Sequence, residues 1–343
     1  MKPHFQSKLL FVIIVLGLFI ACNLDKNKAS ITNSVYWWNG DGTRYNSNFE
    51  SYLPWLKTNQ ISKIYFKQYD IDWNNAQGIF PINGVNEAPN DVAIRLYHQF
   101  IPCIFITNTV FENANEAELK ELSERLAAKI DTSFLEYQID CDWSAGTKDK
   151  YFMFLNLLKQ KLPKHIQSVT IRLFQYKYPD KTGIPPADRG ALMLYNFNSP
   201  KNYSEQNSIF DKEEALKYVS TEKYKLPLDF ILPSFSWSVI YANKVFVGLL
   251  RNFDAKNALT FCNQKSKIIF ESKSDTVLED FYIRKGNEIK VEDIDAKSMQ
   301  EANDLIAKFK NTDQYTVSIF SLSDKTKSIV HHEFAKSIYR ITE

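Results

Sequence analysis

The chain has 343 residues, enough for one large domain or two ordinary ones. Its 42 basic and 40 acidic residues leave a formal net charge of +2, which gives no reason to expect nucleic acid as a partner. Three cysteines follow Cys22 without close spacing, and neither a metal-ligand cluster nor a nucleotide-binding loop stands out, so we expect no disulfide framework, no metal and no cofactor.

The first 21 residues predict a signal peptide for export. Lys2 and Lys8 precede an unbroken apolar run from Leu9 to Ala21. That run has 13 residues, fewer than the roughly 20 that a spanning helix needs, which favours a cleaved signal over a permanent membrane anchor. Cleavage before Cys22 removes both lysines and leaves a mature chain with a net charge near zero.

The end of the apolar run, Phe19-Ile20-Ala21-Cys22, resembles the lipobox of bacterial lipoproteins, with Phe19 where leucine is commonest. The resemblance implies that Cys22 carries lipid and that the new amino terminus is acylated, for example by palmitate. Several acyl chains together give stable membrane anchoring. Residues 22–33 are polar and lysine-rich, as in a flexible tether. We expect a lipid-anchored protein of the cell envelope, on its periplasmic or outer-membrane face.

The remainder, residues 34–343, alternates strand-like and helix-like segments and is expected to form a single domain. Eight runs rich in aromatic and β-branched residues predict strands. They are Val35–Trp38, Ile61–Tyr69, Ile101–Thr107, Phe134–Asp142, Val169–Phe174, Ala191–Tyr195, Phe230–Phe235 and Thr316–Leu322. Eight strands with helices between them predict an α/β fold, a (β/α)8 TIM-like barrel, with an open doubly wound sheet as the rival fold.

Four segments show helical periodicity: 115–130, 150–162, 210–219 and 298–309. The first and last begin with the spacing of a capping box, Asn115 with Glu118 and Ser298 with Glu301. Residues 265–295 break the alternation before the last strand. Two short strands on either side of Gly286 predict an inserted hairpin there, and a small separate C-terminal domain is the alternative. These two strands are Phe281–Arg284 and Glu288–Val291.

One predicted strand, 134–142, carries a polar side chain at every second position. These residues are Glu136, Gln138, Asp140 and Asp142. Such a stripe cannot face an apolar layer of helices, because an unpaired buried carboxylate is very costly. In a barrel it points inward, and its last members reach the C-terminal mouth, where active sites lie. Arg172 on the next strand is expected to pair with Glu136 or Asp140, and a purely structural ion network is the alternative.

A second acidic pair, Asp70 and Asp72, ends the second predicted strand and is followed by Trp73. The first pair, Asp140 and Asp142, is likewise followed by a tryptophan, Trp143. Carboxylates on both sides of a sugar bond are the arrangement that glycoside hydrolysis requires. Capping of the following loop is the structural alternative for the second pair. Lys67 is expected to join this rim. The catalytic candidates are therefore Asp140, Asp142, Asp70 and Asp72.

Flat aromatic and polar side chains near the strand ends suit contact with a carbohydrate. Packing in the core is the alternative for the aromatic members. The candidates for substrate binding are Trp38, Lys67, Trp143, Arg172, Gln175, Tyr195, Asn196 and Trp237.

Two of these strand ends resemble the chitinase-like glycoside hydrolases. Asp140-Cys141-Asp142 is similar to the aspartate run on their fourth barrel strand, and Met193-Leu194-Tyr195 is similar to the Met-x-Tyr of their sixth. The resemblance implies a barrel that acts on glycans. Ser144 stands where the family has its catalytic glutamate, so the family's acid is missing. The run Ile139–Ser144 looks closer still to uncharacterised bacterial barrel proteins.

Three functions stay open at this point. The first is an enzyme acting on glycans through the four aspartates. The second is a non-catalytic glycan-binding lipoprotein that uses the barrel mouth for recognition. The third is an envelope assembly protein that binds a protein partner in the same cleft. Whether the chain is an enzyme is therefore undecided by the sequence, because fold alone does not choose a function.

Overall fold

The structure is a computed structural model that describes residues 30–38, 49–82, 85–204, 206–250 and 253–339. The expected signal peptide and Cys22 lie outside these residues. No helix among the described residues has the length and apolarity needed to cross a membrane. Residues Ile31–Glu343 form one unit by their internal contacts.

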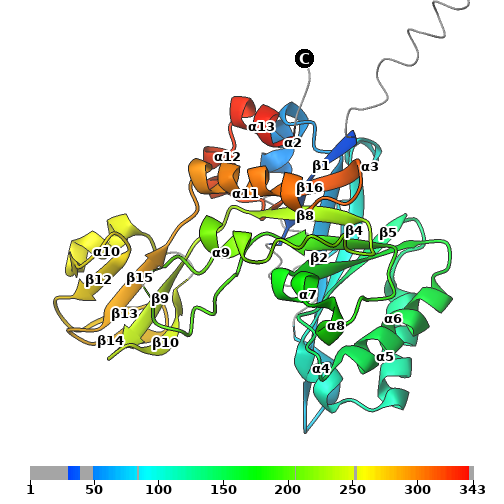
Figure 1. Cartoon of the computed structure of the whole chain (residues 1–343), viewed down its shortest axis with the longest axis horizontal. Helices are drawn as coiled ribbons and strands as arrows, with labels where there is room; N and C mark the ends of the chain where they lie inside the picture. Colours follow the sequence, from blue (N-terminus) through cyan, green and yellow to red (C-terminus); the bar gives the residue numbers. More distant parts are fainter. Residues whose placement is uncertain (1–29, 39–48, 83–84, 205, 251–252, 340–343) are drawn as a thin grey trace, which may run out of the picture. The chain divides into compact units, whose positions relative to one another are not determined.

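Eight parallel strands close into a barrel, which confirms the predicted (β/α)8 fold (Figure 1). They follow the order β1-β16-β8-β7-β6-β5-β4-β2, and β2 pairs with β1 to close the ring. This closure excludes the open doubly wound sheet. The eight strands are β1 (Ser30–Trp37), β2 (Lys63–Asn74), β4 (Gln99–Ile106), β5 (Glu136–Asp140), β6 (Ile166–Arg172), β7 (Arg189–Met193), β8 (Leu228–Pro233) and β16 (Gln314–Phe320).

Strand β2 is the longest of the eight and continues beyond the barrel rim. Its end pairs antiparallel with β3 (Gly78–Pro81) to form a hairpin. In the middle of β2 the register with β4 shifts between Lys67 and Tyr69, which marks a β-bulge. The extra residue interrupts the regular alternation of side chains between the two faces of the barrel wall.

Helices lie in the connections between the strands, and two more follow the last strand. They are η1 (Phe49–Tyr52), α2 (Leu53–Thr58), α3 (Val92–Tyr97), α4 (Asn108–Asn113), α5 (Glu116–Lys129), α6 (Lys148–Lys161), α7 (Leu173–Lys177), α8 (Pro179–Thr182), α9 (Lys212–Leu216), α11 (Ala296–Phe309), α12 (Asp324–Ile329) and α13 (His332–Tyr339). The capping box of Asn115 and Glu118 at the start of α5 is confirmed. The one expected at Ser298 is wrong: Asp295 caps α11 by accepting a hydrogen bond from the backbone N–H of Ser298.

An insertion larger than the expected hairpin separates β8 from α11 (Figure 1). It contains β9 (Trp237–Ala242), β10 (Val245–Leu250), α10 (Ala255–Phe261), β11 (Cys262–Gln264), β12 (Ile269–Ser272), β13 (Thr276–Leu278), β14 (Phe281–Ile283) and β15 (Glu288–Glu292). Strands β10, β9, β15, β12 and β11 form an antiparallel sheet with its own apolar core. The insertion therefore begins at Trp237, ahead of the expected residue 265.

The expected hairpin on either side of Gly286 is wrong, because its two strands pair with other partners. Strand β14 pairs with β13, whereas β15 lies between β9 and β12. The physical reason is burial: Ile289 and Val291 of β15 enter the core that Ile240 and Phe270 share. Apolar burial over five strands outweighs a favourable local turn.

Candidate functional site

A cavity of about 280 Å³ opens at the C-terminal ends of the barrel strands, where active sites of this fold are built. It collects eight of the expected site residues into one place. Its lining consists of Trp38, Lys67, Asp70, Ile82, Phe105, Asp140, Asp142, Arg172, Met193, Tyr195, Asn196 and Phe320. We call this cavity the mouth site.

Below the mouth site the barrel interior is closed by buried polar pairs. Glu136 has no exposed surface and accepts hydrogen bonds from Lys63 at 3.0 Å and from the hydroxyl of Tyr65 at 3.3 Å. Gln138 is equally buried and accepts a hydrogen bond from Tyr36 at 2.7 Å. The inward stripe on β5 thus exists as expected, but its lower members serve the packing of the barrel.

Arg172 does not pair directly with Glu136 or Asp140, so that expectation is wrong. Its guanidinium lies 3.0 Å from the carboxylate of Asp142 and also donates to the backbone carbonyl of Asn196 at 3.4 Å. The reason is that Arg172 and Glu136 lie at different levels along the barrel axis. Arg172 ends its strand at the rim beside Asp142, whereas Glu136 lies at the start of β5, level with Lys63 at the start of β2.

Asp140 lies at the floor of the mouth site and accepts a hydrogen bond from the hydroxyl of Thr170 at 2.6 Å. Loss of solvation raises the pKa of Asp140 to about 7, with a smaller contribution from the negative charge of Asp142. The Thr170 hydrogen bond and the positive charge of Arg172 oppose this rise. A carboxyl group that holds its proton near neutral pH is able to donate it.

The two members of the second acidic pair, Asp70 and Asp72, lie in different places along β2. Asp70 lines the mouth site and forms an ion pair with Lys67 at 2.6 Å, because the bulge lets both side chains point inward. Lys67 also lies 5.7 Å from the ring centre of Trp38. Asp72 does not line the cavity. It accepts a hydrogen bond from Thr107 and belongs to the part of β2 that pairs with β3.

Aromatic rings form one wall of the mouth site. Tyr195 stacks on Phe320 with ring centres 5.6 Å apart, and Trp38 lies 5.4 Å from the same phenyl ring. Phe320 was not singled out in the sequence, although its place as the last residue of the eighth strand is a usable signal. Asn196 adopts a φ of 57°, and its buried Oδ1 has no hydrogen-bond partner among the described residues.

Three expected binding residues lie elsewhere. Trp143 is buried, stacks on Tyr151 and donates to the carbonyl of Thr182 at 2.8 Å. Gln175 is buried beside it and donates to the backbone carbonyl of Trp143 at 2.9 Å. Trp237 starts β9 in place of ending the seventh barrel strand, and it donates to Glu292 of the insertion.

Ser144 also lies outside the mouth site. Its backbone N–H donates to the hydroxyl of Thr147 at 2.9 Å, and the two hydroxyls lie 3.2 Å apart. The side chain therefore stabilises the turn that leads into α6. Nothing in this position replaces the acid that the resemblance leads one to expect.

Comparison with known proteins defines the fold class and no more. No family model matches the chain, and no curated protein matches its sequence. The barrel is similar to the spore cortex-lytic enzyme SleL of Bacillus cereus, with a TM-score of 0.54 at 13% identity over 92% of this chain and 76% of that one. It is also similar to the C-terminal domain of a putative chitinase from Desulfitobacterium hafniense, with a TM-score of 0.54 at 13% identity over 91% of this chain and 98% of that one.

A chitinase from Bacteroides thetaiotaomicron gives a TM-score of 0.50 at 12% identity, over 90% of this chain and 96% of that one. At such identities the likeness concerns the fold. The chain is therefore a (β/α)8-barrel protein with the architecture of chitinase-like glycoside hydrolases.

Proposed function

We propose that the chain is a lipid-anchored protein of the bacterial cell envelope that binds a glycan at the mouth site without hydrolysing it. One observation carries the second half of this proposal: each carboxylate of the mouth site already has a partner. Asp70 is paired with Lys67, Asp142 with Arg172, and Asp140 with the hydroxyl of Thr170. Hydrolysis needs an acid together with a carboxylate that is available to a water or a sugar carbon.

The same cavity has the features of a saccharide-binding surface. Trp38, Tyr195 and Phe320 offer rings for stacking, and Arg172 offers donors to sugar hydroxyls. Asn196 Oδ1 is a buried acceptor without a partner among the described residues, and a ligand hydroxyl would satisfy it. A volume of about 280 Å³ is near the lower end for ligand sites, which favours a short saccharide or a chain end.

The anchored location rests on the amino-terminal sequence. A short apolar signal closed by Ala21-Cys22 supports export and lipid attachment. Metabolic labelling with an alkyne-tagged fatty acid tests it. We expect label in the native chain and none in a Cys22→Ala variant, and equal labelling of both would refute the anchor.

A soluble form of residues 23–343 tests the glycan proposal. Because similar solved structures include chitinases and a cortex-lytic enzyme, the panel starts with chitin oligosaccharides and peptidoglycan fragments and extends to other glycans. Binding is measured by calorimetry and product release by chromatography. We expect binding without release, weakened about tenfold by Trp38→Ala, as for a lost aromatic contact. Tyr97→Ala, an exposed aromatic outside the cavity, is the matched control and should leave binding unchanged.

Hydrolysis is the second candidate, and one observation favours it: the pKa of Asp140, about 7, suits a general acid. Product release that disappears in an Asp140→Asn variant would establish a hydrolase in place of a binding protein. The absence of both binding and release across the panel would refute both carbohydrate functions.

A further inference from the structure

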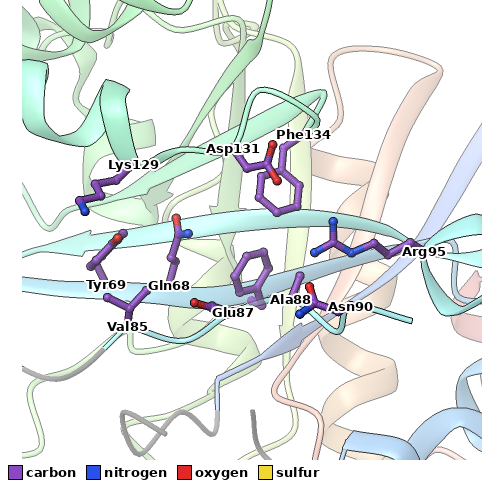
Figure 2. A pocket seen from close by; sticks show the side chains of 11 residues that line it. Gln68, Tyr69, Val85, Glu87, Ala88, Asn90, Arg95, Lys129, Asp131 and Phe134 are labelled. Carbon is purple, nitrogen blue, oxygen red and sulfur yellow. The ribbon is translucent and has the colours of Figure 1, made fainter. Parts of the chain in front are cut away.

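A second and larger cavity, of about 620 Å³, lies on the outer face of the barrel wall, away from the mouth site. The residues that line it, drawn in Figure 2, come from β2, the segment after β3, α3, the end of α5 and the turn that follows α5. We call it the flank cavity. Its lining consists of Phe66, Gln68, Tyr69, Val85, Glu87, Ala88, Asn90, Arg95, Lys129, Asp131 and Phe134.

The cavity exists because the covering layer is short at this point. Helix α3 has only six residues, about 9 Å of helix, whereas β2 has twelve residues. Helix α3 is therefore too short to cover the whole outer face of β2. The bulge in β2 sends Gln68 and Tyr69 to this outer face, while Lys67 and Asp70 line the mouth site.

One buried polar group in the flank cavity lacks a partner. Gln68 is only 7% exposed, and its Oε1 accepts no hydrogen bond from any described residue. Buried acceptors in native proteins are nearly always satisfied, and an unsatisfied one costs about 1–3 kcal/mol. A bound ligand with an N–H or O–H group would supply the missing donor.

Two cationic side chains are available at opposite ends of the cavity (Figure 2). Arg95 is fixed by a hydrogen bond from Nε to the carbonyl of Pro89 at 2.6 Å and lies over the ring of Phe134 at 5.9 Å. Its two terminal nitrogens have no hydrogen-bond partner within the described part of the chain. Lys129, at the other end beside Tyr69, forms no ion pair with any described residue.

Acidic side chains also line the cavity, which excludes a polyanion as its ligand. Asp131 caps the following turn by accepting a hydrogen bond from the N–H of Ser133 at 2.9 Å. That bond and the charge of Arg95 lower the pKa of Asp131, so it is ionised at neutral pH. Glu87 stands on the other side, near enough to Tyr69 to add to the burial that raises the pKa of that phenol.

We propose that the flank cavity binds a short peptide with a free carboxyl terminus. Arg95 presents the fork of N–H donors that matches a carboxylate, and the terminal carboxylate binds there. A backbone N–H of the peptide donates to Gln68 Oε1. Lys129 receives a second carboxylate or a carbonyl oxygen at the far end. The volume, within the range of ligand sites, accommodates several residues. This proposal is independent of the glycan proposal, because the two cavities share no lining residue.

Calorimetry on the full chain in detergent micelles tests the peptide proposal. The probes are the tripeptides Ala-Ala-Ala, Ala-Glu-Ala, Ala-Lys-Ala and Ala-Phe-Ala, each as the free acid and as the C-terminal amide. We expect at least one free acid to bind more tightly than millimolar and its amide to bind about tenfold more weakly, because the charged hydrogen bonds to Arg95 are lost. Equal affinity for acid and amide, or no binding by any probe, would overturn the proposal.

Variants then locate the site. Arg95→Gln should weaken binding of the free acid about tenfold, and Arg95→Lys should weaken it less because the charge stays. Lys129→Gln tests the other end without threatening the fold, since Lys129 forms no ion pair with the described residues; we expect about threefold weaker binding of Ala-Glu-Ala. Arg125→Gln, on the same helix as Lys129 but outside the cavity, is the control. Unchanged binding in both Arg95→Gln and Lys129→Gln would refute the assignment.

Discussion

Glu136 and Asp142 stand at the two ends of one inward-facing stripe, and each has a basic partner on another barrel strand: Lys63 on β2 and Arg172 on β6. Glu136 has no exposed surface, and its partner Lys63 is only 18% exposed. Asp142 is 48% exposed, and its partner Arg172 is 40% exposed. The lower pair is thus enclosed by the barrel and the upper pair is open to solvent. Partial exposure places the upper pair at the surface of the mouth site, and enclosure makes the lower pair part of the core.

The largest effect is expected at the enclosed end. A Glu136→Ala change leaves Lys63 beside a cavity without its counter-ion and leaves the hydroxyl of Tyr65 unpaired. Breaking a buried ion pair by removal of one partner costs about 3–5 kcal/mol. Denaturation in urea should show a loss of that size in the free energy of unfolding. The exposed pair of Glu124 and Lys161 is the control, where Glu124→Ala should cost under about 1 kcal/mol. Equal losses in the two variants would contradict the comparison.

Between the two ends, Asp140 should make stability depend on pH. Its pKa is raised to about 7 in the folded chain, well above that of an unfolded aspartate, so the folded state holds a proton that the unfolded state releases. Stability should therefore fall as the pH rises from about 4 to about 7, by roughly 1.4 kcal/mol for each unit of pKa shift. Subtracting the curve of an Asp140→Asn variant isolates this contribution. A wild-type curve parallel to that of the variant across this window would disprove it.

A smaller effect is expected when Thr170, the hydrogen-bond donor to Asp140, is replaced. Thr170→Val keeps the shape of the side chain and removes its hydrogen bond, which costs about 1.5–3 kcal/mol when the carboxyl group is ionised. That bond lowers the pKa of Asp140, so its loss should raise the pKa further. Carboxyl resonances followed by NMR titration report the shift directly. A titration midpoint that is unchanged or lower in Thr170→Val would contradict this account.

The strands and the inward stripe were predictable because both depend on local patterns. Aromatic and β-branched runs located all eight barrel strands, and alternation along β5 placed Glu136 and Asp140 on the inner face. The bulge in β2 left no mark in the sequence. Because the bulge could not be predicted, neither the ion pair of Lys67 with Asp70 nor the outward direction of Gln68 could be predicted.

The predictions that were wrong concern two kinds of feature. The first is the direction of side chains just beyond a strand end, and the second is the pairing of strands that lie far apart in the sequence. Trp143 and Gln175 follow their strands closely, yet both side chains turn into the core, where Gln175 donates to the backbone carbonyl of Trp143. A strand end fixes where the chain leaves the barrel, and it does not fix the direction of the next side chain. For β15, the apolar core with β9 and β12 decided the pairing, and a window of a few residues holds no information about that core.

The smallest stability effect is expected at the open end, and this result separates the two halves of the stripe most clearly. An Asp142→Asn change removes the ion pair with Arg172, but solvent reaches both side chains and compensates for most of the loss. Exposed pairs contribute about 0–1 kcal/mol, so the free energy of unfolding should change by no more than that. Saccharide binding in the same variant should nevertheless weaken, because Arg172 loses the partner that holds its guanidinium in the mouth site. Parallel urea denaturation and calorimetry on one protein preparation check both halves. A large loss of stability with unchanged binding would assign Asp142 to the core and remove it from the site.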